Sequence, residues 1–91
     1  MIITEDAVLR EFRRIPGVGI QISKDLWNLG FRSVIELKNQ NPEELYQKHC
    51  LIQGGKVDRC MLYVFRCAVY FATEPEPDKE KLKWWYWKDT I

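Results

Sequence analysis

The chain of 91 residues lacks the long apolar run that a membrane-spanning helix needs. Such a helix takes roughly 18 or more consecutive apolar residues. The most apolar stretch, MLYVFRCAVYFA, is shorter than that and contains Arg66. The N-terminus carries Glu5 and Asp6 in place of a basic segment followed by an apolar one, which argues against a secretory signal peptide. We therefore expect a cytoplasmic protein with no membrane partner.

Cysteines are few, and their number of three is odd, so they predict no disulfide framework. The candidate metal ligands are His49, Cys50, Cys60 and Cys67, because two antiparallel helices could bring them together. These residues lack the CxxC or HxxxH spacing of a typical site, and free cysteine is commonly a buried packing residue. We expect neither a metal ion nor another cofactor, with these four residues as the weak alternative.

Net charge is also small, since 14 lysines and arginines oppose 13 aspartates and glutamates. Domains that bind nucleic acid strongly usually carry a clear basic excess. Any nucleic-acid binding by this chain must therefore depend on local geometry. The spacing of Ser23, Asp58 and His49 is not typical of a catalytic set, so we expect no enzyme activity.

The chain does contain the start and stop signals of six short helices, and it lacks the alternation typical of strands. The predicted helices span residues 4–14, 20–29, 33–38, 42–50, 56–72 and 79–88. The helix at 56–72 is apolar on nearly all sides in its second half, which indicates burial at the centre of the fold. We expect one all-α domain, with a core over residues 1–72. A stiff acidic linker and a C-terminal helix, within 73–91, then pack on that core.

The stretch RRIPGVGIQISKDL breaks a helical pattern with a proline and two glycines. Glycine costs about 1 kcal/mol and proline about 3 kcal/mol inside a helix, so the break indicates a use. Gly17 and Gly19 permit positive φ and the close approach of another molecule. The amides of Gly17, Val18 and Gly19 would then lie at the positive end of the following helix, which is typical of a phosphate site. Gln21 and Lys24 lie one turn further along and could reach the same phosphate or its neighbour.

A degenerate copy of this turn follows 37 residues later. When Gly17 is superposed on Gly54, the equivalent pairs are Ile15 with Ile52, Ser23 with Cys60 and Leu26 with Tyr63. The copy has no proline, and Lys56 stands where the first turn has Gly19. The predicted contacts of this second turn are Gly54, Gly55 and Lys56.

The order apolar–Pro–Gly–apolar–Gly, followed four positions on by the small Ser23, resembles the helix-hairpin-helix motif. Over nearly the whole chain, the stretches IPGVG, DLWNLG, GGKVDRC, LYVFRCAVYFA and KLKWWYWKD resemble a small bacterial family of pathogenicity-locus proteins. These resemblances imply a duplicated helix-hairpin-helix core of five short helices. In domains of that type the two hairpins lie side by side and hold the backbones of duplex DNA across the minor groove. The family itself implies no established activity.

The stretch KWWYWKD has the most unusual composition of the chain. On a helix, Leu82, Trp85 and Tyr86 would share one side, while Trp84 and Trp87 would share another. In one interpretation this helix is buried almost entirely in a groove of the core. In the other, Trp84 or Trp87 is exposed as an anchor at a protein interface or as a platform for base stacking.

Two functions remain open at this stage. The leading one is non-catalytic, sequence-independent binding of the nucleic-acid backbone through the two turns, with double-stranded DNA as the expected partner. The alternative is a protein-interaction module that forms a homodimer or binds another protein through its aromatic C-terminal helix. Acidic residues near the first turn, Glu11 and Asp25, partly offset its basic neighbours.

Overall fold

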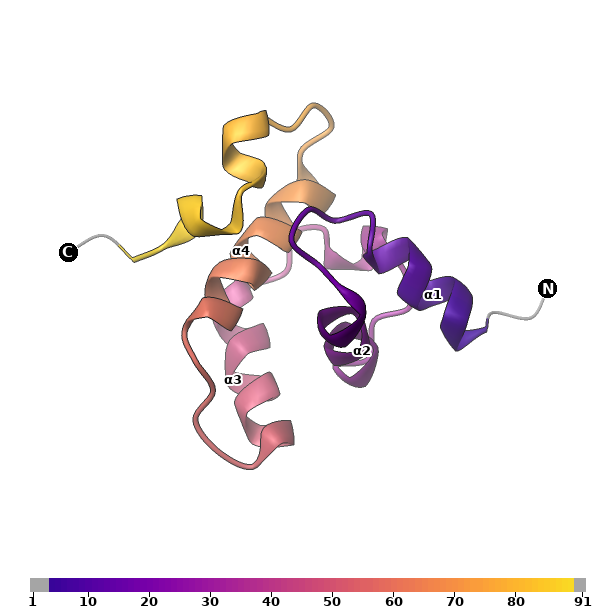
Figure 1. The fold of residues 1–91 in the computed structure, drawn as a ribbon, viewed down its shortest axis with the longest axis vertical. Helices are drawn as coiled ribbons and strands as arrows, with labels where there is room; N and C mark the ends of the chain where they lie inside the picture. Colours follow the sequence, from indigo (N-terminus) through magenta and orange to yellow (C-terminus); the bar gives the residue numbers. More distant parts are fainter. Residues whose placement is uncertain (1–3, 90–91) are drawn as a thin grey trace.

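The computed structural model describes residues 4–89, and the regular structure in that range is entirely helical (Figure 1). Its elements are α1 (Glu5–Phe12), α2 (Ile20–Asn28), η1 (Val34–Leu37), α3 (Pro42–Gln53), α4 (Cys60–Thr73), η2 (Lys79–Leu82) and η3 (Trp84–Trp87), where η denotes a 3-10 helix. The predicted all-α class is confirmed. The predicted count of helices is not reproduced, because the third is a single 3-10 turn and the last divides into two.

Helices α1 and α2 pack against each other across the glycine-containing turn. Thr4 begins α1 as expected, since its hydroxyl accepts a hydrogen bond from the amide of Ala7 at 3.2 Å. The turn between the helices is well packed on its inner side, where Ile15 and Val18 are buried. Gly17 adopts a φ of 84°, a left-handed conformation that favours glycine. The turn is therefore a rigid part of the core with one outward-facing side.

Helices α3 and α4 form a second packed pair, joined by a longer connection. Helix α3 ends at Gly54, which has a φ of 78° and closes the helix in the left-handed conformation. Helix α4 was expected to begin at Lys56 but begins at Cys60, because residues 56–58 are not helical. The Asp58 carboxylate accepts a hydrogen bond from the Cys60 amide at 2.8 Å and so fixes this later start.

Helix α4 lies at the centre of the fold, in contact with η1, α3, η2 and η3. Its residues Leu62, Phe65 and Cys67 are completely buried. Leu62 and Phe65 belong to a core to which α1, α2, η1 and α3 also contribute, including Phe12, Leu26 and Leu37 among others. The burial predicted from the apolar character of this segment is confirmed.

In the C-terminal segment, residues 79–89, one helix was expected over 79–88, but the structure has two 3-10 turns separated by Lys83. Lys83 has extended backbone angles, which turn the chain so that the second unit packs on α4. In a 3-10 helix the side chains at i and i+3 are eclipsed, so Trp84 and Trp87 lie on the same side. Within the described range, none of the helices has the length and apolar character needed to cross a membrane.

Candidate nucleic-acid interface

The N-terminus of α2 presents a row of main-chain amides without acceptors. The amides of Gly19, Ile20, Gln21 and Ile22 donate to no acceptor among residues 4–89, and the first bond of the helix runs from Ser23 N to Gly19 O at 3.0 Å. Gly19 has no side chain to cap the helix, and the first turn contains no acidic residue. Because the helix dipole is positive here, these four amides form a site suited to an anion.

Access to these amides differs on the two sides of the turn. A Cβ placed on Gly19 would meet no atom within 4 Å, so the turn is open at that point. A Cβ placed on Gly17 would lie 3.4 Å from Cδ1 of Trp84, so the C-terminal segment covers that side. Val18 contributes nothing to the site, because its amide donates to Ile15 O at 3.1 Å and its side chain is buried. The expected role of the Val18 amide is therefore wrong.

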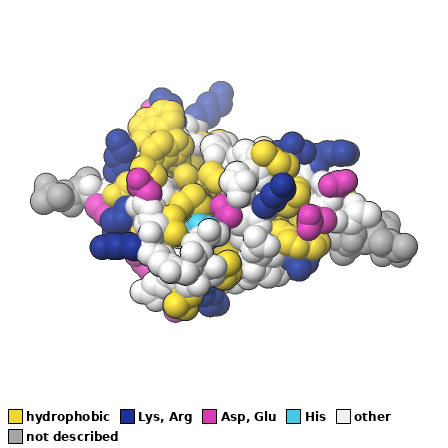
Figure 2. Space-filling view, turned by 60° about the horizontal axis from the view of Figure 1, so that its bottom comes forward, with side chains coloured by type: hydrophobic (Ala, Val, Ile, Leu, Met, Phe, Trp, Pro, Cys, Tyr) yellow, Lys and Arg dark blue, Asp and Glu magenta, His cyan; other side chains and the backbone are white. Residues whose placement is uncertain are grey.

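Basic side chains near the turn are present but not concentrated. Lys24 is exposed one turn into α2, and Arg13 and Arg14 are exposed at the end of α1. Figure 2 shows lysine and arginine side chains distributed among acidic and apolar ones over one face of the molecule. Because the net charge of the chain is only +1, long-range electrostatic attraction of a polyanion is weak, and affinity has to come mainly from short-range contacts.

The second turn does not offer a matching site. The amides of Gly54 and Gly55 donate to Leu51 O and Cys50 O, at 3.2 and 3.0 Å, and so satisfy the end of α3. The Asp58 carboxylate already lies at the N-terminus of α4, where hydrogen bonds from the amide and the thiol of Cys60 hold its pKa below the ordinary value. A phosphate would meet a negative charge at this position. The expectation that Gly54 and Gly55 present free amides is therefore wrong, although both residues are exposed. Of the predicted second-turn contacts, only the exposed Lys56 keeps a donor that could reach a phosphate.

The proposed register between the two turns is not reflected in their packing. Ile15 and Ser23 are buried, whereas their expected counterparts Ile52 and Cys60 are exposed. The reason lies in the connection to the following helix: α2 begins at Ile20 soon after its turn, while residues 56–58 delay the start of α4.

The four candidate metal ligands are not brought together. Cys67 and His49 are buried, Cys50 is half-buried and Cys60 is exposed. Over the described part of the chain, no three His, Cys, Asp or Glu side chains converge as metal ligands. Burial raises the pKa of the Cys67 thiol to about 11, so it stays protonated at neutral pH. A protonated thiol is a poor ligand, which is consistent with a packing role for this residue.

The two candidate interface tryptophans are half-buried and hold the C-terminal segment on the core. Trp84 packs against the core cluster and against Gly17. Trp87 stacks on Tyr70 with ring centroids 5.3 Å apart, and its indole nitrogen donates to Lys81 O at 2.7 Å. The exposed aromatic residues are instead Trp85 and Tyr86, with 52% and 51% of their surface accessible.

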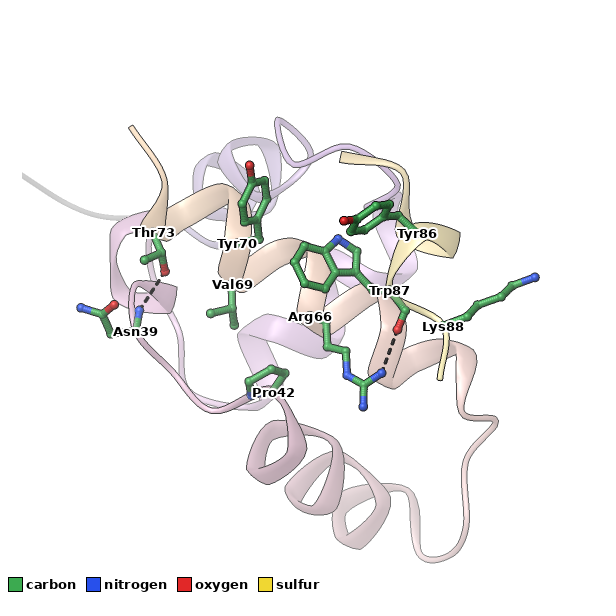
Figure 3. A pocket seen from close by; sticks show the side chains of 9 residues that line it. All are labelled: Asn39, Pro42, Arg66, Val69, Tyr70, Thr73, Tyr86, Trp87 and Lys88. Carbon is green, nitrogen blue, oxygen red and sulfur yellow. Dashed lines mark hydrogen bonds between the residues drawn. The ribbon is translucent and has the colours of Figure 1, made fainter. Parts of the chain in front are cut away.

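An open cavity of about 570 Å³ lies between this segment and α4 (Figure 3). At its edge, the guanidinium of Arg66 donates to Trp87 O at 2.7 Å and forms ion pairs with Asp89 and Glu43. Asp89 also pairs with Arg59, at 2.6 Å. These charges are satisfied within the protein. Arg59 and Arg66 therefore serve to attach the C-terminal segment to α4.

A sequence model of the Cdd1 family, whose description is "Pathogenicity locus", matches residues 5–91. The chain belongs to this family. The resemblance noted from the sequence is confirmed to that extent. No curated protein matches the chain, and no solved structure matches it either. The pathogenicity-locus description names no reaction, ligand or partner, so the function has to be argued from the geometry.

Sequence reasoning missed one arrangement in this pathogenicity-locus protein. Asp25 was considered only as a charge that offsets its basic neighbours, and His49 only as a weak metal ligand or as part of a rejected catalytic set. The structure places Asp25 and His49 in one cleft between α2 and α3, together with Gln21 and Gln53. The available signal was the spacing of four residues between Gln21 and Asp25 and again between His49 and Gln53. This spacing puts both members of each pair on one face of a helix.

Proposed function

We propose that this protein binds the phosphodiester backbone of DNA, without sequence preference and without catalysis, through the N-terminus of α2. The observation that carries the proposal is the row of four amides, from Gly19 to Ile22, that have no acceptor among residues 4–89. An exposed helix N-terminus of this kind accommodates a phosphate oxygen by direct N–H donation. Gln21 and Lys24, both exposed, extend the same surface by one helical turn.

In this proposal α1, the PGVG turn and α2 act as a helix-hairpin-helix element. Helices α3 and α4 form a second, diverged element of the same kind, with η1 as the connector between the pairs. Support for the first element comes from the buried Ile15, Ser23 and Leu26, which fix the turn against the core. The second element contributes packing and the exposed Lys56, since its amides are satisfied internally. A single working turn contacts few phosphates, so it predicts modest affinity with a correspondingly small salt dependence.

Gly19→Asp tests the proposal directly. Gly19 has a φ of −92°, which any residue adopts, and space around it is open. Aspartate is a preferred N-cap residue, so we expect a gain of a few tenths of a kcal/mol in folding stability. The new carboxylate would occupy the free amides and repel phosphate. Fluorescence anisotropy with a labelled duplex at low salt should show a loss of affinity of at least about tenfold, given the strength of charge-assisted bonds to phosphate.

Gln47→Glu is the matched control, because it adds the same charge at an exposed position of α3. We expect it to change duplex affinity far less than Gly19→Asp does. Equal binding by the wild type and Gly19→Asp, with both proteins folded, would reject the proposed function. Equal losses in the two variants would also reject it, because net charge alone would then explain the effect.

The second candidate function is self-association or binding of a partner protein through the aromatic C-terminal segment. The observation that favours it is the exposure of the adjacent Trp85 and Tyr86. Aromatic residues of this kind are frequent anchors at interfaces. Sedimentation of the wild type and of Trp85→Ala tests it: a dimer that dissociates in the variant and is indifferent to DNA supports this function over the first.

A further inference from the structure

A cleft of about 270 Å³ opens between α2 and α3 and is lined mainly by polar side chains. Helix α2 contributes Gln21 and Asp25, and α3 contributes His49 and Gln53. Val57 and Met61 complete the lining. The volume is just below the roughly 300 Å³ at which pockets for drug-sized ligands begin, so the cleft has room for one small planar group. We refer to it as the Asp25–His49 cleft.

Its two central side chains are deeply buried yet have no hydrogen-bonding or ionic partner within residues 4–89, although the His49 ring packs edge-on against Phe65. Asp25 is 7% exposed and His49 is 4% exposed. Neither side chain forms a hydrogen bond or an ion pair with another described residue. Among the described residues, every side-chain nitrogen or oxygen that is fully inaccessible to solvent has a hydrogen-bond partner. The polar atoms of Asp25 and His49 must therefore reach the cleft. In Figure 2 the only histidine of the chain is visible at the surface.

The unpaired carboxylate is costly, and this cost indicates a missing ligand. Burial raises the pKa of Asp25 above its ordinary value, and the nearby His49 offsets only part of that effect. Buried carboxylates in folded proteins are normally paired or hydrogen-bonded. A carboxylate accepts with two oxygens, so it is best satisfied by a group with two adjacent N–H donors. The carboxamides of Gln21 and Gln53 provide further donors and acceptors at the rim of the cleft.

Two groups present adjacent N–H donors in this way: the guanidinium of an arginine and the Watson–Crick edge of guanine. Electrostatics favours the neutral base. Gln21, in the first turn of α2, lines the cleft, so the cleft lies beside the positive end of this helix, which disfavours a cation. The same positive end favours a phosphate, and Gln21 belongs to both the cleft and the row of free amides. One turn of α2 can therefore contact a base in the cleft and the phosphate of the same nucleotide at the free amides.

We propose that the Asp25–His49 cleft binds an unpaired guanine base of a nucleic acid whose phosphate lies at the N-terminus of α2. This inference builds on the proposed function and adds a ligand preference to it. Bases in a perfect duplex keep their Watson–Crick edges paired, so only a looped, overhanging or extruded guanine can enter. The protein would then prefer DNA that contains such a guanine over fully paired DNA of the same length.

The experiment compares three labelled DNAs by fluorescence anisotropy: a fully paired hairpin, the same hairpin with one unpaired guanine, and the same with one unpaired adenine. We expect the guanine form to bind at least about fivefold more tightly than the adenine form, because one bidentate pair discriminates by roughly five- to 150-fold. Asp25→Asn should abolish this preference without weakening the binding of the fully paired hairpin. Gln53→Ala, at an exposed position, should weaken the preference, while the matched Gln47→Ala should not.

The outcomes separate this inference from the proposed function. Equal binding of all three DNAs, unaffected by Asp25→Asn, would overturn the cleft inference and leave backbone binding intact. Binding of free 5′-GMP but of no DNA, lost in Asp25→Asn, would overturn both the backbone proposal and the inferred nucleic-acid ligand, and would leave the cleft as a site for a free nucleotide. Binding of an arginine-containing peptide without any guanine preference would overturn the cleft inference in favour of a protein partner.

Discussion

At the scale of single residues, the two glycines of the first turn have different roles. Gly17 needs its left-handed φ of 84° and touches Trp84, whereas Gly19 has an ordinary φ and open surroundings. Gly17→Ala should lower the free energy of unfolding by about 1–2 kcal/mol, the cost of a left-handed L-residue. Gly19→Ala should change it by less than about 0.5 kcal/mol, because the entropic gain and the weaker N-cap offset each other. Urea unfolding of both variants checks this difference, and equal effects would contradict it.

Asp25 provides a second prediction at this scale, and its sign is unusual for a carboxylate. Burial raises the pKa of Asp25 in the folded state, so the ionised form opposes folding above the ordinary pKa. Asp25→Asn should therefore raise the Tm at pH 7, and the difference should shrink as pH falls toward 4. Thermal unfolding at several pH values measures it. The control Asp6→Asn, in the first turn of α1, should lower the Tm slightly. A lower Tm for Asp25→Asn at pH 7 would mean that this carboxylate is stabilised within the fold.

At the scale of elements, the C-terminal segment is attached to α4 by charges as well as by aromatic packing. Hydrogen bonds from Arg59 and Arg66 hold the pKa of Asp89 below its ordinary value. A carboxylate with a lowered folded-state pKa contributes stability above its ordinary pKa of about 3.9 and loses that contribution as pH falls through the lowered value. The attachment of the segment should therefore weaken below about pH 4.

Asp89→Asn should reproduce the acid effect at neutral pH. We expect faster hydrogen exchange in η3 (Trp84–Trp87), with little change in α1 and α2, because the substitution removes both arginine contacts. Exchange measured by mass spectrometry at pH 7 provides the test. The matched control is Asp78→Asn, a similar change at the cap of η2 that leaves the contacts of Arg66 intact. Unchanged exchange in η3 of Asp89→Asn would show that aromatic packing alone holds the segment.

At the scale of the whole molecule, the fold should unfold as one unit. Trp84 contacts the turn between α1 and α2, and Trp87 packs on α4, so the C-terminal segment joins both ends of the core. Three of the four tryptophans lie in this segment, and their fluorescence reports mainly on it. Fluorescence and far-UV circular dichroism should therefore give the same urea midpoint. An earlier fluorescence transition would show that the segment detaches before the core unfolds.

Much of the fold could be predicted from local signals. Proline and glycine punctuation located α1, α2 and α3 to within a few residues, because these residues act on their own segment of backbone. The start of α4 and the division of the last helix could not be predicted in this way. The start of α4 depends on the hydrogen bond between the Asp58 carboxylate and the Cys60 amide. The division of the last helix accompanies the packing of Trp84 on the core and of Trp87 on Tyr70.

The sequence by itself determined the helical class, the central burial of α4 and the turn at Gly17, since each follows from local periodicity or from backbone sterics. Only the tertiary structure decided which amides remain free, because that depends on whether a neighbouring carbonyl or carboxylate reaches them. In the tertiary structure the first four amides at the N-terminus of α2 have no acceptor among the described residues, whereas the amides of Gly54 and Gly55 donate to carbonyls at the end of α3. The tertiary structure also brought Asp25 and His49 into one cleft, since residues on different helices meet only through packing.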